Sequence, residues 1–465
     1  MVRWILFFRS KKFINNSGCM KNNFYGRLFF CGIGLLAVAF VLFKTSHVFC
    51  EDIYPDNLEL SKSTNTETFD IMERISLLYH DLHVGPVGIK PSYKINEVFD
   101  DNVFSAPTNE VSDFYTSHKA DVGLVYPVFD NLLTHLDYDA EIYTYERVQE
   151  RDHINQSLKG VLEFAFPNDF KFSIADQIRK YTIPPGVQRR FYGDIIVIGV
   201  PIEDLGVNAF TPKANITRNL ATFALDFPDF ISNLDFSVQY VNDVVRYQEE
   251  TFKSSEYNSN TIGATVEYTH PFFPIRLSSG FLYSYWQYYN YEEYSSTRTD
   301  IPFSVDWKIN PKHDVYVNTH YKKSDYKSGS PIENFEGWEF VFGDRYYITP
   351  VSTIEVYAER SLKEQRRDDN NAFFYTVFGL KYVLKQNRFN TTIDTYYSHV
   401  KFREVTEALG SAEEVDGVNF HFNIKYTPQN WWFAEFDYTY TLFDDTVSLG
   451  NLNKNVVSLG VGLNF

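Results

Sequence analysis

The sequence predicts an all-β protein, a transmembrane antiparallel up-and-down β-barrel of about 18 strands, with about sixteen as the lower bound. Three observations lead to this fold. Stretches in which apolar and polar residues alternate recur from Val87 onward, and short turns alternate with longer polar loops between them. Aromatic residues make up 18% of the sequence although its mean hydropathy is only −0.30. Strands with one apolar and one polar face combine these two properties.

Residues 1–50 predict an upstream extension followed by a signal peptide. After a second candidate start at Met20, two basic residues precede the apolar run Leu28–Phe43, and Cys50 stands at the expected cleavage position. An uncleaved anchor is the alternative, but the apolar run is short, because a helical span needs about 20 residues. We therefore expect export and cleavage near Cys50.

Residues 51–83 predict a polar periplasmic leader. Between Thr68 and Leu82, apolar residues recur at spacings of three and four, which is the pattern of one amphipathic helix. Two interpretations remain open: a helix that covers the inner mouth of the barrel, and a solvated leader.

Residues 84–465 predict the barrel itself. From Ala434 to Leu442, for example, the even-numbered residues are apolar or aromatic, whereas the odd-numbered ones include Glu435, Asp437 and two threonines. Successive side chains of a strand point to opposite faces. One face of each strand is therefore expected to meet lipid and the other to face the interior.

The connections predict which end of the barrel is which. Short ones carry turn residues, as at Phe227–Asp229, Asn310–His313 and Gln386–Asn387, and the longest loop is Ile183–Val207. Outer-membrane barrels have short periplasmic turns and longer extracellular loops. The chain is therefore expected in the outer membrane of a diderm bacterium, in contact with outer-membrane lipid.

The last predicted strand carries an assembly signal. Val461, Leu463 and Phe465 share one apolar face with Val457 and Leu459, and the aromatic residue ends the sequence. This ending resembles the C-terminal signal that the barrel assembly machinery recognises. The resemblance implies that machinery as a partner.

The opening of the barrel region resembles a known family. Gly85-Pro-Val-Gly-Ile-Lys-Pro-Ser-Tyr93 precedes Phe99-Asp-Asp-Asn-Val-Phe104, an order similar to the opening of the β-barrel porin 2 family. Members often lie beside exopolysaccharide or capsule operons. The resemblance thus implies a role in polysaccharide export, with the polymer and secretion-system components as further partners. Read alone, Asp100–Asn102 predict an Asx turn that ends a strand rather than a cation site, because the spaced oxygen ligands of a calcium loop are missing.

Composition and motifs exclude several functions. The net charge of −17 argues against nucleic acid as a partner. The sequence contains no GxSxG elbow, HExxH motif or glycine-rich phosphate loop. His421 and Asn423 share one strand face and are the strongest pair for a hydrolase, but we interpret them as interior residues. The prediction is therefore a protein without enzymatic activity, and we assign no catalytic, cofactor-binding or metal-binding residues and no cofactor.

The polar faces predict the lining of a pore. Its candidate residues are Asp137, Asp139, Glu141, Glu163, Asp235, Glu267, Asp394, Glu435, Asp437, Arg179, Arg189 and Arg190. Because acids outnumber bases there, we expect a preference for cations or neutral polymers. The alternative is that acids pair with bases on the next strand, as Lys425 could with Glu435 or Asp437. Arginines near the loop Ile183–Val207 either form a constriction or belong to an extended strand.

Three functions fit these patterns. The first is a channel that serves the export of an extracellular polysaccharide. The second is a general or substrate-selective diffusion porin, and the third is a structural or enzymatic barrel. The sequence ranks them in this order.

Overall fold

A computed structural model describes residues 82–464, except for 106–109, 130, 167–169, 185, 188–209, 212, 291, 331–333, 365–371, 406–411 and 446–451. The predicted signal peptide, nearly all of the leader and Phe465 lie outside these described residues. Among them, no helix is long and apolar enough to cross a membrane.

The described part of the chain forms eighteen long strands. They are β2 (Val87–Asp100), β3 (Asp113–Phe129), β4 (Leu132–Tyr145), β5 (His153–Ala165), β6 (Lys171–Ile183), β9 (Ala214–Ile231), β10 (Leu234–Tyr247), β11 (Tyr257–Thr269), β12 (Ile275–Tyr288), β13 (Ser296–Asn310), β14 (His313–Tyr326), β15 (Phe335–Thr349), β16 (Ser352–Glu364), β17 (Ala372–Gln386), β18 (Phe389–Val405), β19 (Ala412–Gln429), β20 (Trp432–Asp445) and β21 (Leu452–Asn464). The shorter elements are β1 (His83–Val84), β7 (Gly186–Val187), β8 (Phe210–Thr211) and the 3-10 helices η1 (Gln149–Arg151), η3 (Glu250–Ser255) and η4 (Glu292–Tyr294).

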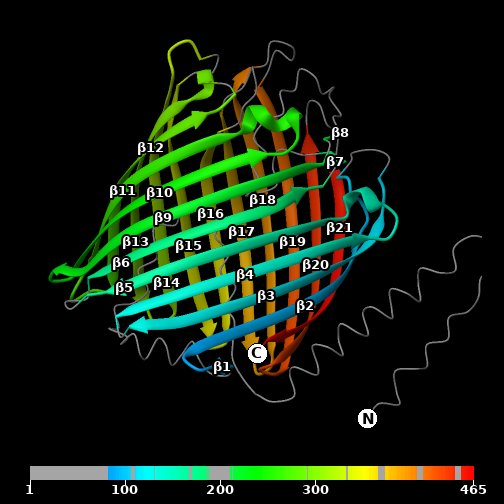
Figure 1. Ribbon diagram of the computed structural model, residues 1–465, viewed down its shortest axis with the longest axis horizontal. Helices are drawn as coiled ribbons and strands as arrows, with labels where there is room; N and C mark the ends of the chain where they lie inside the picture. Colours follow the sequence, from blue (N-terminus) through cyan, green and yellow to red (C-terminus); the bar gives the residue numbers. More distant parts are fainter. Residues whose placement is uncertain are drawn as a thin grey trace, which may run out of the picture. The chain divides into compact units, whose positions relative to one another are not determined.

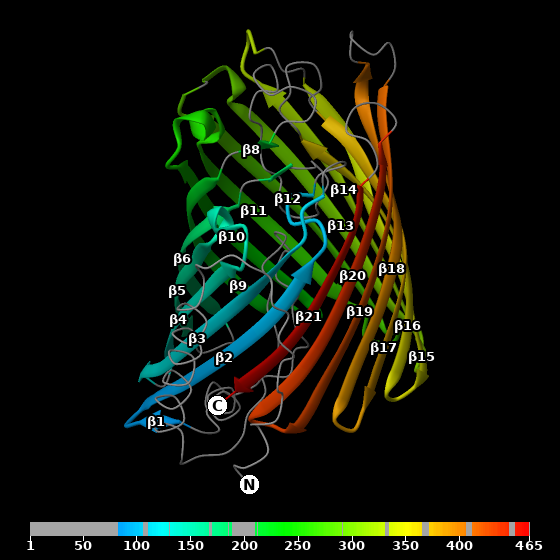
Figure 2. The same cartoon turned by 90° about the vertical axis from the view of Figure 1, so that its right-hand side faces the viewer.

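The long strands close into a barrel. Each pairs antiparallel with its neighbours in chain order, and β2 pairs with β21 over a register that runs from Ser92 opposite Asn464 to Asp100 opposite Val456. Figures 1 and 2 show the first strands and the last strands side by side at this seam. Closure pairs the backbone groups that an open sheet would leave at its edges, which is the condition for strands to span a membrane. The predicted fold class is confirmed.

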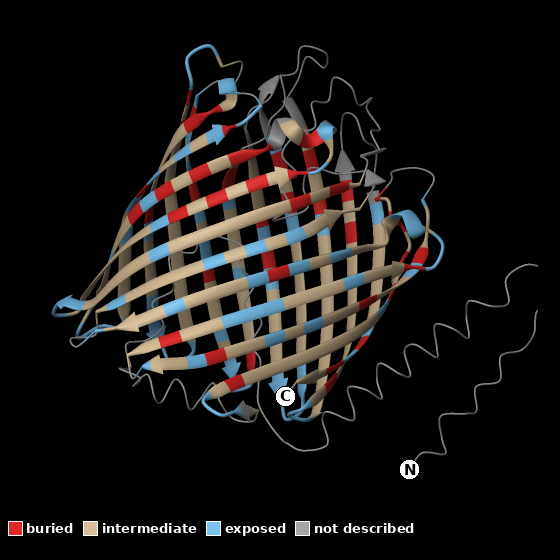
Figure 3. Ribbon diagram, in the orientation of Figure 1, coloured by how far each residue is buried: buried red, intermediate tan, exposed pale blue. Residues whose placement is uncertain are grey.

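The two faces of the wall differ as the alternation predicts. On β21, Leu459 and Val461 are 61% and 48% exposed, whereas Gly460 and Gly462 between and after them are buried. Buried, intermediate and exposed residues intermingle along the strands in Figure 3. Exposed large apolar residues occupy alternate positions on several strands, as at Trp338, Phe340 and Phe342 of β15, so the outer face is the apolar one. A few polar pairs interrupt it, including Asn219 with Asp176 at 2.7 Å and Tyr93 with His118 at 2.6 Å.

The short turns lie partly where the sequence predicts them. Strand β17 ends at Gln386, and Asn387 takes a left-handed φ of 53° in the turn. The predicted turn at Phe227–Asp229 is wrong, because β9 continues to Ile231. Asp229 adopts a positive φ of 48° inside the strand, and the register with β10 shifts near this point. The irregular strand end accommodates the Pro-Asp pair, and the turn itself follows at residues 232–233.

The predicted Asx turn is confirmed at the end of β2. The backbone N–H of Asn102 donates to Oδ1 of Asp100 at 3.0 Å, and Lys454 lies 2.8 Å from the other oxygen of that carboxylate. Asp101 accepts the backbone N–H of Asn455 at 2.8 Å and its side-chain amide at 2.7 Å. The Asp-Asp-Asn segment therefore ties the end of the first long strand to the start of the last one.

Buried apolar side chains gather at one mouth of the barrel. Ile216, Tyr247, Tyr257 and Tyr288 pack together near the ends of β9 to β12, and Phe252 of η3 completes the cluster with no exposed surface. This cluster fixes the ends of four strands. Elsewhere the inner wall carries charged and hydrogen-bonded side chains beside single buried apolar ones such as Leu133 and Val377.

Candidate functional site: the inner wall of the barrel

The described acidic residues that were predicted to line a pore lie on the inner face. On β4, Asp137 and Asp139 alternate with the outward Leu136 and Tyr138, which are 40% and 43% exposed. The strand period places the other described candidates on the same inner face, namely Glu141, Glu163, Arg179, Asp235, Glu267, Asp394, Glu435 and Asp437. Arg189 and Arg190 lie outside the described residues, so a constriction by their loop stays a prediction.

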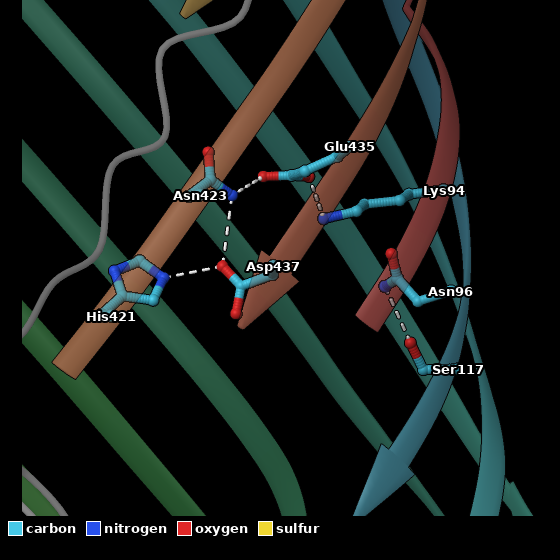
Figure 4. A network of polar contacts seen from close by, with 7 residues as sticks. All are labelled: Lys94, Asn96, Ser117, His421, Asn423, Glu435 and Asp437. Atoms are coloured by element: carbon cyan, nitrogen blue, oxygen red, sulfur yellow. Dashed lines mark hydrogen bonds and ion pairs between the residues drawn. The ribbon is translucent and has the colours of Figure 1, made fainter. Parts of the chain in front are cut away.

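A polar network crosses the seam of the barrel (Figure 4). Nζ of Lys94 on β2 lies 2.6 Å from Oε2 of Glu435 on β20. The side-chain amide of Asn423 on β19 donates to Glu435 at 2.6 Å and to Asp437 at 3.2 Å. His421 lies 2.6 Å from the same oxygen of Asp437. The network thus joins three strands, β2, β19 and β20, and brings two predicted residues, Glu435 and Asp437, together around one amide.

Two glycines of β21 make room for side chains of the neighbouring strands, one for the seam network and one for an aromatic ring. Gly460 stands opposite Glu435 on one side and Asn96 on the other, so Lys94 must pass over β21 to reach its partner. A Cβ atom at Gly460 would overlap Oδ1 of Asn96 and lie 3.2 Å from Cε of Lys94. A Cβ atom at Gly462 would overlap the ring of Phe433. The small face of the last strand therefore serves contacts between its neighbours.

Within the part of the chain that the structure describes, Lys425 does not form the predicted ion pair with Glu435 or Asp437. Lys425 stands opposite Glu435 in register, but its Nζ lies 3.9 Å from the centroid of the Phe433 ring. Glu435 instead takes its cation from Lys94, which is 341 residues away in the sequence. The buried ring of Phe433 supplies an attractive surface for the ammonium group.

Charges of opposite sign alternate across six consecutive strands, β13 to β18. Each residue stands opposite the next in register, and we call this set the charge ladder: Lys308, Asp314, Arg345, Glu355, Lys381 and Asp394. Within it, Nε of Arg345 lies 2.9 Å from Oε1 of Glu355. Opposite charges on facing positions stabilise a sheet and cancel much of each other's field. This side of the wall therefore carries positive and negative charges, and neither sign dominates.

Other predicted pore-lining residues make contacts outside the seam network. Arg276 lies 3.6 Å from Glu267 and 3.2 Å from Asp306, so it compensates acids on both neighbouring strands. Asp235 accepts the backbone N–H of Asp229 at 2.7 Å and thus belongs to the turn at the end of β9. The structure does not bring the acids of β4 into the network at the seam.

Several inner-wall residues were not predicted from the sequence. Lys94, Arg345 and Tyr357 were not singled out, although each lies on a polar strand face. The sequence does contain a signal for tyrosines on this wall, because an acid recurs two positions before a tyrosine, at Asp314, Glu355 and Asp394. The partner of Lys94 had no comparable signal, because register across the seam is set only when the barrel closes.

The polar side chains of the inner wall contact one another across neighbouring strands. No group of three or more His, Cys, Asp or Glu side chains in the described ranges is arranged to hold a metal ion. His421 and Asn423 both bind Asp437, which makes them members of the seam network.

Comparisons with known proteins concern the barrel as a whole. No family model and no curated protein matches the sequence. Among solved structures, the chain is similar to the siderophore receptor PirA from Pseudomonas aeruginosa, with 9% identity, a TM-score of 0.45 and coverage of 81% of this chain and 80% of that chain. It is also similar to OccAB3 from Acinetobacter baumannii, with 10% identity, a TM-score of 0.49 and coverage of 82% and 100%. For the FrpB iron transporter from Neisseria meningitidis, the identity is 9%, the TM-score 0.46 and the coverage 77% and 62%.

The architecture itself identifies the membrane in which the chain lies. A closed barrel with an apolar outer face, a polar inner wall and an even number of antiparallel strands is an outer-membrane protein.

Proposed function

We propose that this outer-membrane barrel is a channel that serves the export of an extracellular polysaccharide. The observation that carries the proposal is the charge ladder on the inner wall, which offers donors and acceptors in alternation. Uncharged sugar hydroxyls can donate to its acids and accept from its bases, whereas a mobile ion meets a repulsive partner beside each attractive one. The resemblance of the Gly85–Phe104 region to the β-barrel porin 2 family supports the same function.

The width of the barrel supports transport of a hydrated chain. Barrels of sixteen to eighteen strands are wide enough to hold water, whereas about eight strands leave room for little more than side chains. The chain forms eighteen long strands within its described ranges. The proposal extends to polymer and secretion-system components as partners.

Two measurements test this function. In the producing organism, deletion of the gene should abolish surface polysaccharide while the polymer accumulates inside the cell, and the wild-type gene should restore export. In planar bilayers, the purified barrel should conduct ions with weak charge selectivity, and added neutral polysaccharide should block the current. Normal surface polymer in the deletion strain, together with unblocked currents, would overturn the proposal and favour a diffusion porin.

A further inference from the structure

A second row of residues runs beside the charge ladder on the same inner wall. Tyrosine and glycine alternate in register from β14 to β18, and we call this set the tyrosine–glycine row: Tyr316, Gly343, Tyr357, Gly379 and Tyr396. The outward neighbours are Phe342, Val356, Phe378 and Leu380, which are 44%, 53%, 57% and 47% exposed. The row therefore faces the interior. Strands β15 to β17, which carry its centre, lie side by side in Figure 2.

Each glycine of the row lies beneath an aromatic ring. A Cβ atom at Gly343 would overlap the ring of Tyr316, and one at Gly379 would overlap the ring of Tyr357. A ring can approach the backbone this closely only because the glycine has no side chain. Both rings consequently lie against the wall rather than projecting into the interior, and both keep part of their surface exposed.

Carboxylates of the charge ladder fix the far end of each ring. The hydroxyl of Tyr316 on β14 donates to Oε1 of Glu355 on β16 at 2.9 Å. The hydroxyl of Tyr357 on β16 donates to Oδ1 of Asp394 on β18 at 3.0 Å. Each tyrosine thus spans two strands, and the same arrangement repeats after a shift of two strands. Arg345 adds a cation–π contact to the first ring, with Cζ 4.9 Å from its centroid.

We propose that Tyr316, Tyr357 and Tyr396 form a stacking track that crosses strands β14 to β18 and on which a neutral polysaccharide chain packs along the inner wall of the barrel. This inference rests on the proposed function and names the chemical class of its substrate. The apolar face of a pyranose ring packs on an aromatic ring, while its equatorial hydroxyls reach groups beside the ring. The wall provides both, because the tyrosine–glycine row and the charge ladder run in parallel.

The repeat of the wall fits a repeating ligand. Successive tyrosines are two strands apart, a separation of roughly 10 Å given the spacing of neighbouring strands, which is close to the length of a disaccharide. A chain shifted by one repeat would meet equivalent rings and equivalent acids. Alternating ladder charges favour a neutral polymer, since a polyanion would meet Glu355 and Asp394 beside the rings.

The test measures block of single-channel current by linear neutral glucan oligosaccharides, from the disaccharide to the heptasaccharide. We expect affinity to rise with length until the oligosaccharide spans two tyrosines and then to level off. Tyr357→Leu should weaken binding of the longer oligosaccharides about tenfold, equivalent to about 1.4 kcal/mol. The conservative variant Tyr357→Phe keeps the ring and should recover most of that affinity. A polyuronate oligosaccharide of equal length should block more weakly than the neutral one.

Phe433→Leu is the matched control. Phe433 also covers a glycine of the inner wall, Gly462, but it is only 6% exposed and lies beneath Lys425. Its loss should perturb the wall to a similar extent without changing glucan affinity. Heat-modifiable gel mobility verifies that each variant is folded.

The outcomes separate the track from the proposed function. Equal glucan affinity in the wild type and Tyr357→Leu, or equal loss in Phe433→Leu, would overturn the track, even if polymer export depends on the barrel. If export in the organism does not require the barrel, the proposed function fails, although ring-dependent glucan binding could still be measured.

Discussion

Lys94 and Glu435 form an ion pair across a strand to which neither of them belongs. Their charged atoms are 2.6 Å apart, and the side chains are 32% and 18% exposed. Strand β21 lies between β2 and β20, and the absence of a side chain at Gly460 leaves the passage open. The pair therefore reports correct closure of the barrel, in addition to stabilising it.

The first prediction concerns the strength of this pair. In a double-mutant cycle of Lys94→Ala and Glu435→Ala, we expect a coupling energy of about 1 kcal/mol in the free energy of unfolding, near the upper end for partly exposed pairs. Urea titration of the barrel in detergent or liposomes measures it. The control cycle uses Lys401 and Glu414, which are 2.7 Å apart but 56% and 39% exposed, and should give a smaller coupling. Equal coupling in both cycles would contradict a special role for the seam.

The second prediction concerns the passage over β21. Gly460→Val would place side-chain atoms against Asn96 and where Lys94 crosses, so the variant should close poorly and show a reduced heat-modifiable fraction at equal expression. The control is Gly160→Val, because the nearest neighbour of a Cβ atom there is Cδ1 of Leu136, at 4.0 Å. Normal mobility of the Gly460 variant would show that the seam tolerates other positions of the Asn96 and Lys94 side chains.

A third prediction compares adjacent residues on β4. Tyr138→Lys would place a charge on the lipid face and should destabilise the barrel by roughly 2–4 kcal/mol if the site lies near the midplane. Asp139→Lys changes only the inner wall, so the barrel should fold and its reversal potential should shift toward anions. Bilayer recordings and unfolding titrations measure the two effects. A destabilised Asp139 variant beside an intact Tyr138 variant would mean that the faces are reversed.

The fourth prediction concerns the tie between Asp101 and Asn455. Asp101→Ala removes two hydrogen bonds to a partly buried segment and should cost about 1–3 kcal/mol. Hydrogen exchange of the Asn455 amide should accelerate, while amides in β10 stay protected. Asp101→Asn retains one acceptor oxygen and should give an intermediate rate. An unchanged exchange rate in the alanine variant would show that the strand pairing alone holds this end.

The fold could be predicted from the sequence because successive side chains of a strand point to opposite faces, so the apolar pattern repeats every two residues. Alternation assigned Glu435 and Phe436 to opposite faces, and the exposed and buried residues of β21 follow the same rule. Local chemistry also predicted the Asx turn of Asp100, since its hydrogen bond joins residues only two apart.

The partners on the inner wall could not be predicted in the same way. Lys425 faces Glu435 in register, but a ring next to it and a lysine from the first long strand changed both pairings. Such choices depend on closure and on which side chains are missing from β21. The turn near Asp229 was misplaced for a related reason, because a bulge lets a strand continue through a Pro-Asp pair.

The pairing of β2 with β21 has a consequence for synthesis. Asp101 and Asn455 are 354 residues apart, so the strand that leaves the ribosome first must wait for the barrel's last strand. Until then the growing sheet has two unpaired edges that could join the edges of other chains. Bringing such distant segments together is also slow, because the loop entropy precedes any gain from contact. The rate of seam closure therefore sets how long the edges of β2 and β21 stay open to pairing with other chains.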